Sequence, residues 1–126
     1  MIHFTMNIKN TINSVKKLII SASIIIAACA AKASKPNPHT DTFKVWGNCG
    51  MCEKKIEEAA SKIKGVIKAD WIAEKGQMIL IYNPAQTNVE EVQKAIAAVG
   101  YDTEKVRADD KVYNKLHGCC QYEREK

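Results

Sequence analysis

The 126-residue sequence lacks the usual marks of an enzyme. It contains no Ser/His/Asp set, no glycine-rich loop of the kind that cradles phosphate, and no pair of carboxylates at a spacing suited to acid–base catalysis. These absences predict a binding protein rather than an enzyme.

Excess positive charge is also missing from the main body of the chain. The net charge is +5, but Lys9, Lys16, Lys17 and Lys32 precede Ser34, and no Asp or Glu does. Removing these four lysines leaves a charge of +1 on the rest. We therefore expect no basic surface for DNA or RNA.

Long hydrophobic runs are absent as well. The apolar run from Leu18 to Ala28 is shorter than the roughly 20 residues of a membrane-spanning helix. Lysines precede it, which predicts a signal peptide over residues 1–33. Cleavage after Ala31-Lys32-Ala33 would release a soluble protein, whereas Ile26-Ala27-Ala28-Cys29 resembles a bacterial lipobox and would leave a lipid-anchored Cys29. The sequence thus predicts an exported, periplasmic protein, either soluble or lipid-anchored.

Two cysteines three positions apart, Cys49 and Cys52, precede a segment with helical periodicity. At a helix N-terminus, backbone N–H groups and the helix dipole favour thiolate over thiol. Gly47 and Gly50 lack a Cβ atom, which lets the loop bring both sulfurs toward one point. Two thiolates suit Cu(I) or Hg(II), whereas structural zinc usually takes four ligands.

Two other interpretations of this cysteine pair remain. One is a structural disulfide or two ordinary buried cysteines. The other is a thioredoxin-like thiol–disulfide oxidoreductase, because Trp46 closely precedes the motif. Gly47-Asn48 displaces this Trp from Cys49, and the chain ahead of the motif is short for the leading βα unit of that fold. A mobile soft-metal site is therefore the leading hypothesis, and the oxidoreductase is the alternative.

Strand and helix patterns alternate around the cysteines. Residues 34–40, with two prolines, are typical of a linker, and the apolar alternation in residues 42–46 predicts a strand. A helix is predicted next, closed by Gly65, with one apolar face made of Ile56, Ala59, Ala60 and Ile63.

A hairpin and a second helix complete the predicted domain. Residues 66–73 and 77–82 form the hairpin strands, and Trp71 is expected to fill the core. Thr87 to Glu90 has the capping-box form that opens a helix, and residues 101–107 suit a last strand. The order βαββαβ predicts an α+β, ferredoxin-like sandwich over residues 41–108, with two helices on one face of an antiparallel four-stranded sheet.

Residues 109–126 form a polar tail with a second cysteine pair, Cys119 and Cys120. Adjacent cysteines can be joined to each other only through a strained ring, so they are free thiols, part of a long-range disulfide, or auxiliary soft-metal ligands. His117 would be an optional nitrogen donor. A tail of about ten residues spans at least about 15 Å, enough to return toward Cys49 and Cys52.

The segment from Cys49 to Arg107 resembles the heavy-metal-associated domain of copper metallochaperones, copper-transporting P-type ATPases and a periplasmic mercury-binding protein. The matching residues are Cys49-x-x-Cys52, Gly65-Val66, Ala69, Tyr82-Asn83-Pro84, and Ala95-Ile96 leading to Gly100-Tyr101. The family usually has Met, a buried anchor of the loop, where Gly47 stands, while Met51 lies between the cysteines here. This departure leaves the shape of the loop and its metal preference open.

The resemblance implies capture and hand-over of a soft cation by thiolate exchange. The leading hypothesis is therefore an exported protein that either sequesters the ion or delivers it to a membrane transporter. Cys49 and Cys52 would be the ligands, and Tyr101 would either shield the ion or lie at the edge of the core. Cu(I) is favoured, with Hg(II) or Zn(II) as alternatives. Cys119 with Cys120 suggests a site of more than two sulfurs, or two metals bound together. The implied protein is a monomer whose partner is a metal-transporting membrane protein, either a P-type ATPase or a mercury or copper transporter.

Overall fold

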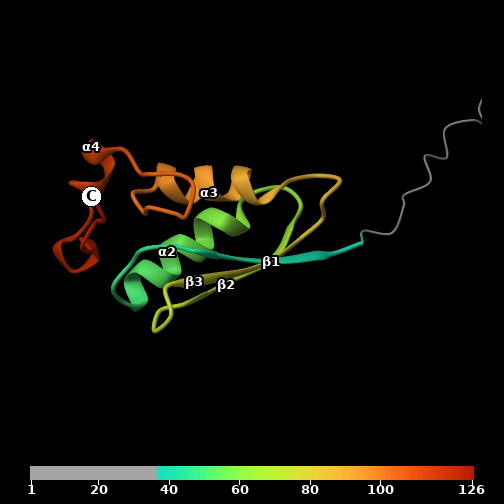
Figure 1. The fold of residues 1–126 in the computed structure, drawn as a ribbon, viewed down its shortest axis with the longest axis horizontal. Helices are drawn as coiled ribbons and strands as arrows, with labels where there is room; N and C mark the ends of the chain where they lie inside the picture. The colour runs from blue at the N-terminus through green and yellow to red at the C-terminus, as the bar shows by residue number, and fades with distance from the viewer. Residues whose placement is uncertain (1–36) are drawn as a thin grey trace, which may run out of the picture. The chain divides into compact units, whose positions relative to one another are not determined.

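The computed structural model describes residues 37–126. The predicted signal peptide with Cys29, and the first residues of the predicted linker, lie outside this range. The elements within it are β1 (His39–Lys44), α2 (Gly50–Ser61), β2 (Val66–Ile72), β3 (Gln77–Tyr82), α3 (Val89–Ala98), α4 (Asp110–Tyr113) and a 3₁₀ turn, η1 (Gly118–Cys120), as Figure 1 shows.

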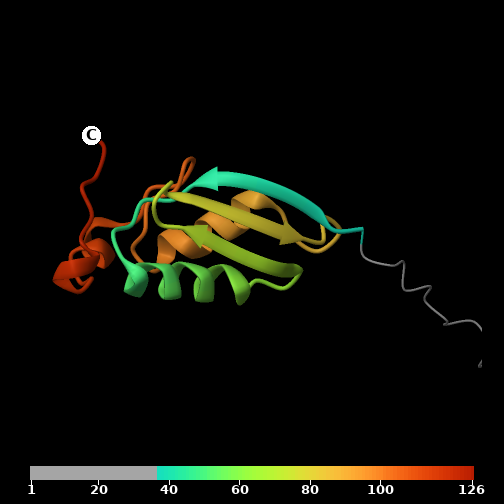
Figure 2. The ribbon, with the colours of Figure 1, turned by 90° about the horizontal axis from the view of Figure 1, so that it is seen from below.

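The three strands form one antiparallel sheet in the order β1-β3-β2, seen side by side in Figure 2. Alternate residues of the central strand, Met78, Leu80 and Tyr82, are buried. Both α2 and α3 lie on the same side of the sheet (Figures 1 and 2). Trp71 is only 2 % exposed and its indole N–H donates to the carbonyl of Val45 at 3.1 Å, which confirms its expected place in the core.

Two of the predicted boundaries are wrong in detail. Strand β1 begins at His39, inside the predicted linker. Helix α3 is capped by Asn88, whose side chain accepts the backbone N–H of Glu91 at 3.0 Å. The hydroxyl of Thr87 is instead buried without a hydrogen-bond partner, so the predicted capping box does not form. The Asn88 side chain satisfies the same free helix N–H groups.

The predicted fourth strand is wrong within the described residues. A single antiparallel bridge, Val45 to Thr103, joins this segment to the sheet edge. The backbone N–H of Thr103 donates to the carbonyl of Val106 at 2.8 Å, and the N–H of Val106 donates back to the Thr103 hydroxyl at 3.2 Å. Around the bridge the Trp46 N–H donates to the Asp102 carbonyl and the Glu104 N–H donates to the Lys44 carbonyl, both at 3.0 Å. The turn from Thr103 to Val106 then bends the chain, so pairing stops after one bridge.

The tail, which its polar sequence predicts to lie outside the core, contributes to the core. Leu116, Cys120 and Tyr122 are buried and belong to the main hydrophobic core cluster. Leu116 packs directly on Gly100, whose φ of +104° suits glycine, and a Cβ added there would lie 3.0 Å from a Leu116 methyl carbon. The tail is therefore part of the folded domain. Within residues 37–126, none of the helices combines the length and apolar character needed to cross a membrane.

Candidate metal centre

The loop between β1 and α2 places Cys49 and Cys52 at the start of the helix. Cys49 is the N-cap residue, with an extended backbone, and its carbonyl accepts the backbone N–H of Glu53 at 3.0 Å. Cys52 lies in the first helical turn rather than on the loop. The two Sγ atoms are 3.7 Å apart, so one ion could contact both.

The two thiols differ in exposure and in acidity. Cys49 is partly exposed, and the backbone N–H groups of Cys52 and Met51 lower the pKa of its thiol to about 7. Cys52 is fully buried, and burial raises the pKa of its thiol even though the Asn48 N–H donates to its Sγ at 3.5 Å. At neutral pH, Cys49 therefore supplies the more accessible thiolate.

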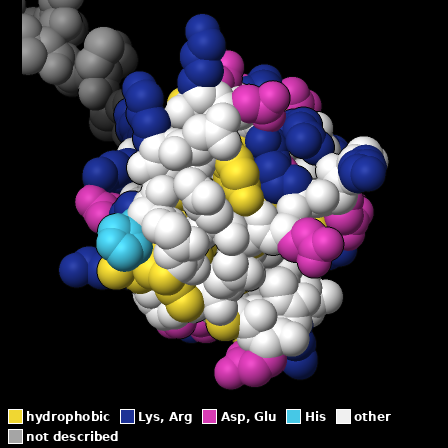
Figure 3. All heavy atoms as spheres, turned by 90° about the vertical axis from the view of Figure 1, so that its left-hand side faces the viewer, with side chains coloured by type: hydrophobic (Ala, Val, Ile, Leu, Met, Phe, Trp, Pro, Cys, Tyr) yellow, Lys and Arg dark blue, Asp and Glu magenta, His cyan; other side chains and the backbone are white. Residues whose placement is uncertain are grey.

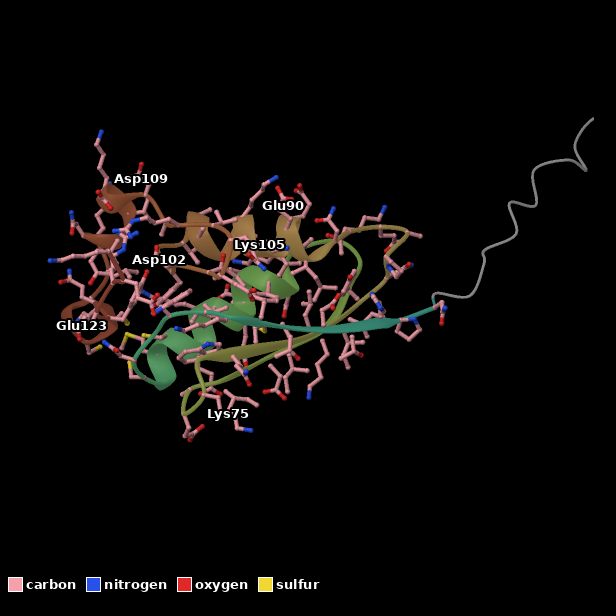
Figure 4. The ribbon with its side chains drawn as sticks, in the orientation of Figure 1. Lys75, Glu90, Asp102, Lys105, Asp109 and Glu123 are labelled. Carbon is pink, nitrogen blue, oxygen red and sulfur yellow. The ribbon has the colours of Figure 1, made fainter. Side chains whose placement is uncertain are left out.

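The tail brings two more sulfurs to this place. The Sγ atoms of Cys49, Cys119 and Cys120 all lie within 4.8 Å of one another, and those of Cys119 and Cys120 are 3.9 Å apart. All four described cysteines are free thiols, with Cys119 exposed and Cys120 buried. In Figure 4 sulfur atoms, drawn in yellow, gather at the end of the domain where Glu123 is labelled.

His117 lies beside this sulfur group but outside it. Its Nδ1 is 3.4 Å from the Sγ of Cys119, and it does not belong to the set of ligand atoms that share the 4.8 Å limit. The imidazole is thus placed to hydrogen-bond Cys119. Figure 3 views this end of the domain and shows a histidine next to a small patch of the hydrophobic class, which includes cysteine.

Tyr101 lies beneath the sulfurs. Its side chain is fully buried, and its hydroxyl has no hydrogen-bond partner in the described part of the chain. Burial, together with the neighbouring Cys120 and Cys52 side chains, raises the pKa of this hydroxyl far above its usual range. Tyr101 is therefore a neutral group that faces two thiols from the protein interior.

Known proteins that carry metals are similar to this chain. The model of the heavy-metal-associated domain matches residues 42–102. The mercuric transport protein periplasmic component of Acinetobacter calcoaceticus is 36% identical over 87 residues, which span 68% of this chain and 92% of that protein. The chain belongs to the heavy-metal-associated domain family.

Two further relatives connect this heavy-metal-associated protein to mercury and copper proteins. The copper chaperone CopZ of Staphylococcus aureus is 36% identical over 55 residues, covering 44% of this chain and 81% of CopZ. The crystal structure of oxidised MerP from Ralstonia metallidurans CH34 superposes with a TM-score of 0.51 at 34% identity, over 53% of this chain and 94% of MerP. The predicted resemblance to the heavy-metal-associated domain family is thereby confirmed.

The heavy-metal-associated loop is adapted at Gly47. A Cβ atom there would lie 2.9 Å from a ring carbon of Trp71 and 3.2 Å from the Cδ1 of Ile56. The bulky Trp71 thus occupies the space beside the loop where the resemblance leads us to expect a methionine anchor. Gly50 has open space around it, so the predicted need for glycine applies to Gly47 alone. Met51 is 47% exposed beside the cysteines.

The sequence patterns do not predict the residues that hold the tail in place. The Tyr122 hydroxyl accepts the backbone N–H of Asp102 at 2.7 Å and donates to the carbonyl of Gly100 at 3.0 Å. The Arg124 guanidinium binds the Asp102 carboxylate through Nε at 2.7 Å and Nη2 at 2.6 Å. Tyr122 and Arg124 lie beyond residue 102, where the match to the family ends. Their partners Gly100 and Asp102 are among the last residues of that match.

Proposed function

We propose that this protein captures a soft cation through the thiolates of Cys49 and Cys52 and hands it to a metal-transporting membrane protein. Cu(I) is the favoured cargo, with Hg(II) or Zn(II) as alternatives. The single observation that carries the proposal is the 3.7 Å Sγ–Sγ contact at the N-terminus of α2. Soft thiolates held together at a positive helix end are the donors that such ions prefer.

The unequal exposure of the two thiols supports transfer by ligand exchange. An incoming ion meets the partly exposed Cys49 first, because its lowered pKa of about 7 keeps much of it as thiolate at neutral pH. The ion then gains the buried Cys52 as a second ligand. Release follows the reverse order. A cysteine of the acceptor first replaces Cys49 as a ligand, and Cys52 dissociates from the ion last.

Cys119 and Cys120 act in this proposal as auxiliary sulfur ligands, and His117 as a hydrogen-bond partner of Cys119 or a weaker nitrogen ligand. This role is supported by the distances between the Sγ atoms of Cys49, Cys119 and Cys120, which all lie within 4.8 Å of one another. The Cys119 carbonyl also lies 3.7 Å from the Sγ of Cys49. A soft ion on Cys49 would therefore have other donors within reach.

Export and a membrane partner belong to the same proposal. The lysines and apolar run of residues 1–33 are typical of a signal peptide. The matched mercuric transport proteins are periplasmic components. A zinc-transporting ATPase of Synechocystis matches 49% of this chain at 35% identity, although the match spans 9% of that ATPase. The fold therefore also occurs within a transport ATPase, the kind of acceptor that we propose.

Native mass spectrometry of the reduced protein with Cu(I), Hg(II) or Zn(II) tests this function. We expect tight binding of a soft ion, and its loss in Cys49→Ser and Cys52→Ser. Glu58→Gln is the matched control, because Glu58 is on the same helix and its ion pair with Lys62 is exposed. Absence of bound ion in the wild type, or equal binding in the cysteine variants, contradicts the proposal. Metal-free reduction of insulin by the wild type would instead identify an oxidoreductase.

A further inference from the structure

We propose that the docked tail closes a four-thiolate, tetrahedral site for a divalent d¹⁰ ion, with Cys49, Cys52, Cys119 and Cys120 as its ligands. The inference rests on the proposed function in that Cys49 and Cys52 bind metal. It goes further in naming the four ligands and the geometry of a site for divalent ions, and a closed state that stores the ion. Two-coordinate binding of Cu(I) or Hg(II) would need the first pair alone.

The first observation is the spacing of the sulfurs. Zinc–thiolate bonds are about 2.3 Å long, so neighbouring sulfurs of a tetrahedral site lie roughly 3.8 Å apart. The two Sγ–Sγ distances within the pairs, Cys49 to Cys52 and Cys119 to Cys120, are 3.7 Å and 3.9 Å. Cys49 is also within 4.8 Å of both tail sulfurs. Cys52 lies outside the set of three sulfurs that share this limit, although its Sγ contacts that of Cys49. Side-chain rotations that bring Cys52 nearer to the tail sulfurs would complete the tetrahedron.

The second observation is the buried, unpartnered hydroxyl of Tyr101. A buried polar group without a hydrogen bond costs about 1–3 kcal/mol, and this one adjoins Cys52 and Cys120, which are themselves fully buried. With both thiols deprotonated and metal-bound, their sulfurs become better acceptors for the Tyr101 O–H. A metal ion that converts these thiols to thiolates would therefore also give the Tyr101 hydroxyl a hydrogen-bond acceptor.

The third observation is that contacts remote from the sulfurs hold the tail in place. Tyr122 is buried and its hydroxyl bridges Asp102 and Gly100. Arg124 forms an almost buried ion pair with Asp102 and also donates to the Ala108 carbonyl at 2.7 Å. The intervening Cys119 and Cys120 lie on the short turn η1 between this anchor and Leu116. Preorganised ligands lose little conformational freedom on binding.

Metal binding would release the protons of those thiols that are still protonated, leaving one divalent ion with four thiolates and a net charge of −2. The N-terminal N–H groups of α2 and the Tyr101 hydroxyl stabilise this charge. A four-coordinate ion has no open position for an acceptor's cysteine. Transfer would then require the tail to open, so the closed site stores its ion.

X-ray absorption of the full chain loaded with Cd(II) counts the sulfur ligands directly. We expect four sulfurs in the wild type, three in Cys119→Ser and two in the Cys119→Ser/Cys120→Ser double variant. Cys119 is exposed, so its single variant keeps the fold and remains informative even if the buried Cys120 is needed for stability. We also expect Cys119→Ser to weaken Cd(II) binding by about tenfold or more, since loss of even an outer-shell partner of a ligand typically costs that much.

Two sulfurs in the wild type, or an unchanged count in Cys119→Ser, would overturn the inference. Cu(I) binding separates this failure from failure of the proposed function. If Cu(I) still depends on Cys49 and Cys52 while Cd(II) has two sulfur ligands, the tail site alone is wrong. If neither ion binds, both proposals are wrong.

Discussion

The Arg124–Asp102 pair allows the sharpest test of how the tail is held. Arg124→Gln leaves the Asp102 carboxylate with the Ala108 N–H, at 2.7 Å, but without its charged partner. The two side chains are only 11% and 10% exposed. Removing one partner of a buried ion pair costs about 3–5 kcal/mol. We take the lower end of this range because Arg124 also pairs with Asp110, whose side chain is 76% exposed. Water can therefore reach this side of the guanidinium.

For a domain of this size, about 3 kcal/mol corresponds to a fall in Tm of roughly 12 to 24 °C. Calorimetry measures the fall, and hydrogen exchange follows the Cys120 N–H, which donates to the His117 carbonyl at 2.7 Å. If the tail detaches in the variant, the loss of stability cannot exceed the free energy that docking of the tail supplies. Detachment would, however, expose the Cys120 amide to exchange. Glu58→Gln, which removes an exposed ion pair with Lys62, should leave Tm almost unchanged, because water screens a pair at the surface. A Tm within about 2 °C of the wild type, with the amide still protected, refutes the anchor.

Three further predictions concern stability without metal. Burial alone would raise the pKa of the Asp102 carboxyl, but the Arg124 guanidinium and the Ala108 N–H together lower it. The ionised Asp102 therefore stabilises the fold at pH values above its unfolded pKa of about 3.9. That contribution fades as pH falls through the lower folded pKa, and urea melts should show wild type and Asp102→Asn converging there. Tyr101→Phe removes the unpartnered hydroxyl and should leave stability unchanged or raise it by about 1 kcal/mol; a clear loss in urea melts argues against an unsatisfied group. Gly47→Ala should cost about 1–3 kcal/mol, because its Cβ would meet Trp71, while Gly50→Ala should cost almost nothing; equal melting curves would contradict this contrast.

Local patterns in the sequence predict most of the sheet and both long helices. The hairpin strands follow from apolar alternation around Lys75-Gly76, and β3 lies at the predicted residues 77–82. The last strand stops after one bridge because the chain bends in a local turn between Thr103 and Val106. Competition between such a turn and an edge pairing depends on tertiary contacts, which periodicity does not report.

The sequence does not predict the docking of the tail, for a related reason. Leu116 and Tyr122 stand among polar residues, so neither belongs to a periodic apolar face, and their burial comes from contacts with Gly100 and Asp102 far back in the chain. Two isolated apolar residues flanking a cysteine pair were the available signal. The closeness of Cys49 and Cys52 follows from their spacing on one helix turn, whereas the approach of Cys119 depends on this long-range docking. Which of these cysteines bind metal stays a prediction.

Competition titration of the reduced protein against a chromogenic Cu(I) chelator tests the central claim most directly, because it measures whether the sulfurs of Cys49 and Cys52 hold a soft ion. The account predicts that the wild type withdraws Cu(I) from the chelator and that Cys49→Ser/Cys52→Ser does so far less well. Failure of the wild type to compete, or equal competition by the double variant, would contradict it.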